Sequence, residues 1–161
     1  MRVASHDEFL FRVLEAAHLR SSCEENQGGA VISVQGVPVV VAWSSPPAGR
    51  PGCDAAGHHY VSGFEVVSDP ECVGGKNVTE VFRCDRSMHA EVAAVSAAAR
   101  LGVKIEGAVV HVSAFPCPDC VKMLMNCRIS EIHAAADREG SGPDKAALSE
   151  AGVKWYVDAR E

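Results

Sequence analysis

The second half of the chain alternates short apolar runs with helical segments, and this alternation constrains the fold more than any other feature of the sequence. Residues 108–113, 132–136 and 153–157 have the length and composition of buried strands. Residues 116–126 and 143–150, which lie between them, are helical in pattern and carry a proline at an early position. Strands that alternate with helices predict a parallel sheet covered by helices, so we expect an α/β fold.

The first half of the chain predicts a helix followed by a hairpin. Apolar residues recur on one helical face over residues 6–20. Two β-branched runs, residues 30–34 and 37–43, are separated by Gln35-Gly36. A two-residue connection of this kind is typical of an antiparallel hairpin, so two antiparallel strands should join the parallel ones.

A further alanine-rich helix completes the expected domain. It covers residues 88–101, and Gly102 is placed as its left-handed C-cap. The segments together predict a three-layer α/β/α sandwich around a mixed five-stranded sheet. We expect residues 1–161 to form a single domain. Residues 44–86 are rich in Gly, Pro, Ser and Cys without a sustained period. A structureless stretch of this length usually binds something or is tied down, so we expect a functional insert.

Charge and composition narrow the class of ligand and the compartment. The formal net charge is -6, which offers no overall positive field to hold a long nucleic acid. The sequence has no apolar run that approaches the roughly 20 residues of a membrane span and no secretion signal at its start, so we expect a cytoplasmic protein. Seven cysteines are many for a reducing compartment, where thiols more often bind metal or react than form disulfides.

Two short motifs stand at the starts of two predicted helices. His89-Ala90-Glu91 begins the alanine-rich helix, and Pro116-Cys117-Pro118-Asp119-Cys120 begins the next one. Cys117 and Cys120, three positions apart, share one helical face, and the positive end of the helix dipole favours their thiolates. With the imidazole of His89 they make three protein ligands for Zn²⁺ and leave a fourth tetrahedral position for water, which is how catalytic zinc differs from closed structural zinc.

The residue next to these ligands suggests the reaction. Glu91 is a carboxylate two positions from His89 and can take and return the proton of a water activated by zinc. Such a site is suited to attack an amidine-like ring carbon and to release its amino group as ammonia. The alternative is that Cys117 and Cys120 form a redox pair or a structural zinc knuckle beside an incidental His-Glu pair. The occurrence of both motifs at helix starts favours hydrolytic deamination.

From residue 8 to 157 the sequence resembles the deoxycytidylate (dCMP) deaminase family of the cytidine deaminase-like superfamily of zinc deaminases. Residues 84–91 (CDRSMHAE) are similar to the family segment that carries the histidine and the glutamate. Residues 115–122 (FPCPDCVK) are similar to its second zinc motif, and Asp119 and Lys122 favour the nucleotide branch over tRNA adenosine deaminases and guanine deaminases. Residues 29–32 (GAVI) resemble its first strand.

The resemblance implies a function and a set of site residues. It implies conversion of dCMP to dUMP and ammonia, with His89, Cys117 and Cys120 as zinc ligands and Glu91 as the proton shuttle. The carbonyl of Phe115 would accept a hydrogen bond from the departing amine. Family members commonly assemble as hexamers and respond to dCTP and dTTP, so the resemblance also implies a homo-oligomer. The residues expected to contact the nucleotide are Ala30, Trp43, Ser44 and Phe115.

Departures from the family pattern leave the substrate open. The hairpin loop of the family usually reads Gly-Tyr-Asn-Gly, whereas this chain has Ala42-Trp43-Ser44-Ser45. Ser44 keeps a hydroxyl but lacks the paired donor and acceptor of an amide, and Trp43 could stack on a base or only pack. The alternatives are a modified or antibiotic cytosine nucleoside, a base in single-stranded nucleic acid, which the acidic charge disfavours, or a non-catalytic regulatory subunit that binds zinc and nucleotide.

A second group of cysteines flanks the insert. Cys23, Cys53 and Cys84 resemble positions at which some family members bind a structural zinc. The insert has few apolar residues to fold on its own, and a closed zinc site would stabilise it directly. The fourth ligand could be His58, His59 or Cys72, and we take His59. The alternative is three ordinary buried thiols.

Overall fold

A five-stranded sheet forms the centre of the protein, whose computed structural model describes residues 3–68 and 76–158. The strand order is β2-β1-β5-β6-β7. β1 is antiparallel to both β2 and β5, whereas β5, β6 and β7 are parallel, so the predicted mixed sheet is confirmed. The strands are β1 (Gly29–Val34), β2 (Val37–Trp43), β5 (Val109–Val112), β6 (Glu131–Ala134) and β7 (Lys154–Val157).

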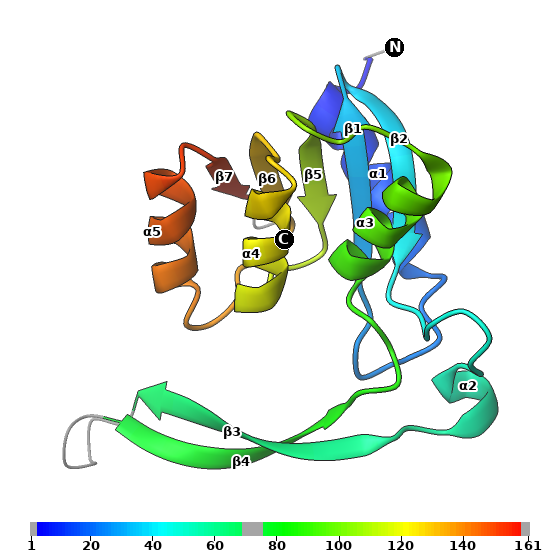
Figure 1. The fold of residues 1–161 in the computed structure, drawn as a ribbon, viewed down its shortest axis with the longest axis vertical. Helices are drawn as coiled ribbons and strands as arrows, with labels where there is room; N and C mark the ends of the chain where they lie inside the picture. The colour runs from blue at the N-terminus through cyan, green and yellow to red at the C-terminus, as the bar shows by residue number, and fades with distance from the viewer. Residues whose placement is uncertain (1–2, 69–75, 159–161) are drawn as a thin grey trace.

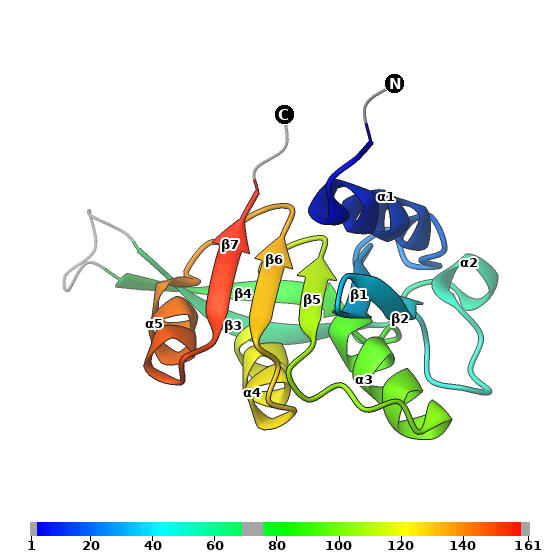
Figure 2. The same ribbon diagram turned by 90° about the horizontal axis from the view of Figure 1, so that it is seen from above.

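Helices cover both faces of the sheet, which confirms the predicted three layers. Figure 2 shows α1 on one face and α3, α4 and α5 side by side on the other. The helices span His6–His18 (α1), Ala90–Leu101 (α3), Pro118–Asn126 (α4) and Gly142–Glu150 (α5). None of the helices among the described residues combines the length and the apolar character that crossing a bilayer requires.

The ends of these elements follow local signals in the sequence. Gln35 and Gly36 both have positive φ, at 52° and 76°, and make the tight turn of the β1–β2 hairpin, which is the backbone that two-residue hairpin loops favour. Gly102 has φ 67° and caps α3 in the left-handed conformation, as predicted. Pro38 lies in β2, an edge strand, and edge strands are where sheets tolerate proline.

Small side chains bring α3 close to the sheet. Ala90, Ala94 and Ala98 are at most 3% exposed and belong to the main apolar core together with Ile32 and Val110. Because alanine side chains are short, α3 packs directly against β1 and β2. This packing fixes the N-terminus of α3, where the first chemical motif lies.

The expectation that the insert, residues 44–86, lacks regular structure was wrong. Residues 44–86 contain a short helix, α2 (Cys53–Ala56), and two long antiparallel strands, β3 (Tyr60–Ser68) and β4 (Lys76–Cys84). Figure 1 shows this ribbon crossing beneath one end of the sheet, where α3 begins. Both faces are exposed at the start of this ribbon, where the successive residues Tyr60 and Val61 are 50% and 39% exposed. Without a buried face at this point, nothing imposes the alternation that marks a strand in the sequence.

Candidate active site

Two helix N-termini carry the three expected metal ligands. His89 is the N-cap residue of α3, and Cys117 is the N-cap residue of α4, in which Cys120 occupies the first turn. The two helices pack against each other, which brings the motifs together although 28 positions separate His89 from Cys117 in the sequence. The fold therefore brings together the three side chains expected to bind the metal.

The ligand atoms are separated as tetrahedral zinc requires. The Nδ1 atom of His89 lies 3.5 Å from Sγ of Cys117 and 3.5 Å from Sγ of Cys120. Zinc binds sulfur at about 2.3 Å and imidazole nitrogen at about 2.0 Å, so tetrahedral ligands of these two kinds lie about 3.5 Å apart. The three side chains therefore fit a zinc ion with three protein ligands.

The two thiols have opposite acidities. Hydrogen bonds from Cys120 and His89 lower the pKa of Cys117 to about 3. The pKa of Cys120 is raised, because its hydrogen bond to Cys117 and its burial both favour the neutral thiol. A second thiolate beside the first is costly unless a cation neutralises the pair, so the donor set is suited to a divalent metal.

Glu91 faces the same cavity as the ligands. A cavity of about 190 Å³ is lined by Glu91, His89 and Cys117. Glu91 lies in the first turn of α3 and is only 8% exposed. Burial raises the pKa of its carboxyl group above the ordinary value. A buried carboxyl whose pKa is raised accepts a proton more readily than an ordinary carboxylate, which fits the role of proton shuttle expected from the sequence.

The residues expected to contact the nucleotide divide into two pairs. Ser44 and Phe115 line the catalytic cavity and are 1% and 2% exposed. Ala30 does not line it, because its side chain packs in the apolar core below the sheet surface. Trp43 lines a neighbouring cavity of about 670 Å³ and lies under Arg20, whose guanidinium is 5.5 Å from the ring centroid. The structure therefore favours packing over base stacking for Trp43.

The cavity wall also contains residues that no sequence motif indicated, which are Asn26, Gln27, Gly28, Ser113 and Arg138. A Cβ atom on Gly28 would lie 3.0 Å from Oγ of Ser44, so this position leaves little room for a larger residue. The run of amide and glycine residues just before β1 is the sequence signal that could have identified this wall, because loops before strands often carry contacts to ligands. Arg138 had no such signal.

The second group of cysteines also converges. Cys23, Cys53 and Cys84 are buried together, and the Sγ atoms of Cys53 and Cys84 lie 3.6 Å apart. Burial and a hydrogen bond with Cys84 raise the pKa of Cys53 to about 12, whereas backbone hydrogen bonds from His59 and Arg86 outweigh burial and lower the pKa of Cys84 to about 6.

The histidine of this group is His58, which corrects the expectation of His59. Nδ1 of His58 lies 3.7 Å from Sγ of Cys23, and all four ligand atoms lie within 4.8 Å of one another. Nδ1 of His59 instead lies 2.6 Å from Asp85. Cys72, the remaining alternative, lies outside the described residues. Three thiols and one imidazole at these separations fit a closed tetrahedral zinc site.

A third cluster of possible ligands does not fit a metal ion. Asp7, His111 and His133 have ligand atoms within 4.8 Å of one another. The rings of the two histidines, however, are stacked with their centroids 4.7 Å apart and their planes only 17° from parallel. Lone pairs in nearly parallel rings cannot converge on one ion, so this cluster is an aromatic stack across β5 and β6.

The comparisons with known proteins agree with this geometry. A family model described as the cytidine and deoxycytidylate deaminase zinc-binding region matches residues 4–136. The chain is 30% identical over 146 residues to deoxycytidylate deaminase of Enterobacteria phage T4, with 74% of each chain covered. It is 29% identical over 146 residues to the same enzyme of Enterobacteria phage T2, covering 74% of this chain and 76% of the relative.

Solved structures show the same fold. The dCMP deaminase of the cyanophage S-TIM5, crystallised with dCMP and dUMP, superposes with a TM-score of 0.71 at 19% identity and covers 98% of this chain and 99% of its own. A deaminase/reductase of Thermotoga maritima, which acts on a diaminohydroxyphosphoribosylaminopyrimidine, gives a TM-score of 0.61 at 15% identity and covers 95% of this chain and 36% of its own.

Proposed function

The chain belongs to the cytidine and deoxycytidylate deaminase family, and from this premise we propose that it hydrolyses dCMP to dUMP and ammonia. The relatives that support this substrate are the two phage deoxycytidylate deaminases. A free nucleotide is the favoured form of the substrate, because a net charge of -6 offers no overall positive field to hold a nucleic acid polymer.

One observation carries the proposal. His89, Cys117 and Cys120 lie at tetrahedral ligand separations, and the buried Glu91 opens onto the same small cavity. A closed structural zinc site would need a fourth protein ligand, and the cysteine and histidine cluster here contains three residues among those that the structure describes. A proton shuttle beside an open metal position is what hydrolysis requires.

The residues divide the reaction between them. Zinc bound by the three ligands would supply a Lewis acid that activates water at neutral pH. Glu91 accepts a proton from the attacking water and delivers it to the ring nitrogen next to C4. Addition of water to C4 converts the ring C=N double bond to a single bond. Glu91 then takes the proton of the new C4 hydroxyl and delivers it to the amino group, so that the C4–N bond breaks, ammonia leaves and the C4=O double bond of the product forms. Phe115, buried in the wall, offers its carbonyl as an acceptor for that amino group.

The size of the cavity fits a single base. Its volume of about 190 Å³ is below the roughly 300–1,000 Å³ of sites that enclose drug-sized ligands. The base would fill it, and the sugar and phosphate would lie towards the open side. Ser44, which donates its backbone N–H to Gly28 at 2.9 Å, is held where the family usually has asparagine, so the sugar contact of this chain differs in chemistry.

We propose a second, structural zinc held by Cys23, Cys53, His58 and Cys84. The separations of 3.6 and 3.7 Å agree with the roughly 3.5–3.8 Å expected for tetrahedral sulfur and nitrogen ligands. The ion would join three chain segments that are far apart in the sequence: the loop after α1, the short α2 and the end of β4. It would thereby anchor the ribbon to the sheet.

We propose further that the chain forms a homo-oligomer, in keeping with the family. Light scattering coupled to gel filtration measures its mass in solution. A mass of several chains supports the proposal, and a mass of about one chain at micromolar concentration contradicts it.

A substrate panel tests the function. Ammonia release is measured for the zinc-loaded protein with dCMP, CMP, deoxycytidine, dCTP and single-stranded DNA at equal cytosine concentration. The highest kcat/KM on dCMP supports the proposal. Activity on DNA or on the nucleoside alone would reassign the substrate, and silence on every compound would favour a non-catalytic zinc-binding and nucleotide-binding subunit.

A further inference from the structure

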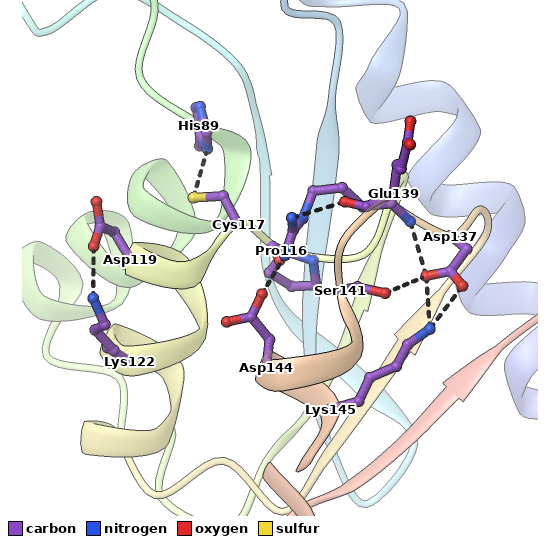
Figure 3. Close-up of polar contacts among 11 residues, drawn as sticks. His89, Pro116, Cys117, Asp119, Lys122, Asp137, Glu139, Ser141, Asp144 and Lys145 are labelled. Carbon is purple, nitrogen blue, oxygen red and sulfur yellow. Dashed lines mark hydrogen bonds and ion pairs between the residues drawn. The ribbon is translucent and has the colours of Figure 1, made fainter. Parts of the chain in front are cut away.

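Arg138 links the loop after β6 to the segment that carries the metal ligands. Its Nε donates to the carbonyl oxygen of Pro116 at 3.2 Å, and one of its terminal nitrogens donates to the carbonyl of Glu139 at 3.2 Å. The other terminal nitrogen binds the carboxylate of Asp144 in the first turn of α5. Figure 3 shows Pro116, Cys117 and Asp144 gathered in this region. All five donors of a guanidinium lie in one plane, so three acceptors fix its orientation.

Phe115, Pro116 and Cys117 follow one another at the metal site, and a backbone group of each makes a hydrogen bond that holds it in place. Phe115 donates its N–H to the carbonyl of Ala136, and the carbonyl of Cys117 accepts from Val121 within α4. Between them, the carbonyl of Pro116 accepts from Arg138. The first and last of these bonds join backbone to backbone, so they survive a change of side chain. Only the middle one depends on a side chain.

The middle anchor sets the peptide plane next to a metal ligand. The bond from Pro116 to Cys117 is planar and trans, so fixing the Pro116 carbonyl also fixes the direction of the Cys117 N–H and the position of its Cα atom. Proline at position 116 has no N–H of its own and a fixed φ, so its carbonyl is its only hydrogen-bonding group. A weaker hold on this carbonyl would let the sulfur of Cys117 shift relative to Cys120 and His89.

The loop that carries Arg138 is itself braced. The Asp137 carboxylate accepts from the backbone N–H of Arg138 at 2.8 Å, from the Ser141 hydroxyl at 2.9 Å and from Nζ of Lys145 at 2.7 and 2.8 Å. The Lys145 ammonium also lies 5.0 Å from the ring centroid of Phe115. Figure 3 shows the side chains of Ser141 and Lys145 pointing to the carboxylate of Asp137. Arg138 therefore extends from a rigid support, which a positioning group requires.

We propose that Arg138 is a positioning residue for the catalytic metal site, acting through the Pro116 carbonyl on the ligand Cys117. Asp144 neutralises and orients its guanidinium. The inference rests on the proposed function, since it assigns Arg138 a part in the same site. It predicts that the geometry and retention of the metal depend on a side chain that ligates nothing.

The test compares Arg138→Gln and Asp144→Asn with Lys122→Gln. Lys122 is an exposed residue of α4 that pairs with Asp119, so its variant controls for loss of a cation near the ligands. Each protein is loaded with Co²⁺, whose absorption reports ligand geometry where zinc is silent, and separately with zinc, whose release to a chelator is timed. Steady-state kinetics on dCMP give kcat and KM.

For Arg138→Gln we expect cobalt bands that differ from wild type in position and intensity, and zinc release faster by about tenfold, as loss of a charge-assisted hydrogen bond implies. The value of kcat should fall while KM changes by less than about threefold. Asp144→Asn should change the cobalt bands, the rate of zinc release and kcat in the same direction as Arg138→Gln, but by a smaller amount. If Arg138→Gln does not fold, Asp144→Asn provides the test of the proposal. Lys122→Gln should match wild type.

Unchanged cobalt bands and unchanged zinc release in both variants would overturn the proposal. A raised KM with unchanged kcat and normal zinc release would also overturn it, because it would show that Arg138 binds the nucleotide directly. Failure of the proposed function is a separate result. If the wild type releases no ammonia from any cytosine compound, the cobalt spectra and zinc release still decide what Arg138 does.

Discussion

Cys53→Ser tests whether the second group of cysteines holds a metal ion. Cys23, Cys53 and Cys84 are 0%, 7% and 8% exposed, and among the residues whose burial is described they form an apolar cluster of their own. Hydrogen bonds such as that from the Asp54 N–H to the Ser22 carbonyl join these segments, and the proposed ion would add a further link between the loop after α1, α2 and the end of β4. The zinc content of wild type should be two per chain, and that of Cys53→Ser should be one. Cys127→Ser, which changes a cysteine outside both clusters, should keep two.

The stability change follows from mass action. At free zinc 100 times its dissociation constant, an occupied site stabilises the folded chain by about 2.7 kcal/mol. In a domain of this size each kcal/mol moves the melting temperature by about 2–4 °C, so loss of the site should lower it by about 5–11 °C. Each saturated site also adds about 1.4 kcal/mol for every tenfold rise in free zinc. The slope of melting temperature against log free zinc should therefore be twice as steep in wild type as in Cys53→Ser.

The assay is thermal unfolding in zinc buffers, followed by circular dichroism, with metal content measured on the same samples. Equal slopes in wild type, Cys53→Ser and Cys127→Ser would refute the reasoning. So would a folded wild type that contains a single zinc, because the buried thiols would then be ordinary core residues.

Three further changes have defined outcomes. Burial lowers the pKa of His111, which is 0% exposed, so below the unfolded pKa of about 6.5 the folded state binds fewer protons than the unfolded state. The free energy of unfolding, measured in urea, should therefore be highest above that pH and fall below it, and the fall should be smaller in His111→Phe. An identical fall in the variant would contradict this. Leu148→Ala, at a fully buried core position, should cost about 2–5 kcal/mol in the same assay, and a cost below about 1 kcal/mol would show that the site is not tightly packed. Removal of zinc by a chelator should abolish ammonia release and added zinc should restore it; activity that survives in metal-free protein would exclude the proposed chemistry.

Features fixed by local chemistry were predictable from the sequence. The turn at Gln35-Gly36, the cap at Gly102 and the two helix N-termini that carry His89 and Cys117 depend on residues a few positions apart. These sequence signals are strong because the backbone preferences behind them act within a single turn. Spacing within the second motif also predicted that Cys117 and Cys120 lie together, because helix geometry alone places them on one face.

Features that depend on where a side chain points in the tertiary structure were not predictable from the sequence. His58 and His59 are adjacent, and which ring turns towards Cys23 depends on the path of the backbone after Gly57, whose φ is 73°. Similarly, whether Ala30 points into the core or into the cavity depends on the register of β1 against its neighbours. Resemblance to a family locates the strand in the sequence but does not tell which of its side chains faces the ligand.

The role of Arg138 was not predictable for a different reason. It lies in a polar loop between β6 and α5, and nothing in its sequence surroundings distinguishes it from a solvated arginine. Its importance comes from a contact with Pro116, 22 positions away, that only the folded chain creates. Contacts of this kind have no periodicity and no fixed spacing, so sequence patterns cannot reveal them.

The central claim is that Glu91 moves protons at a metal site built by His89, Cys117 and Cys120. Glu91→Gln keeps the shape and size of the side chain but cannot accept and return a proton, and general acid–base catalysis contributes about 10²–10⁴-fold for each transfer. The most direct measurement is kcat for ammonia release from dCMP by Glu91→Gln, with zinc content measured on the same sample. We predict a loss of at least about 10³-fold with the zinc content of wild type. Retention of more than about a tenth of the activity, with zinc bound, would contradict the account.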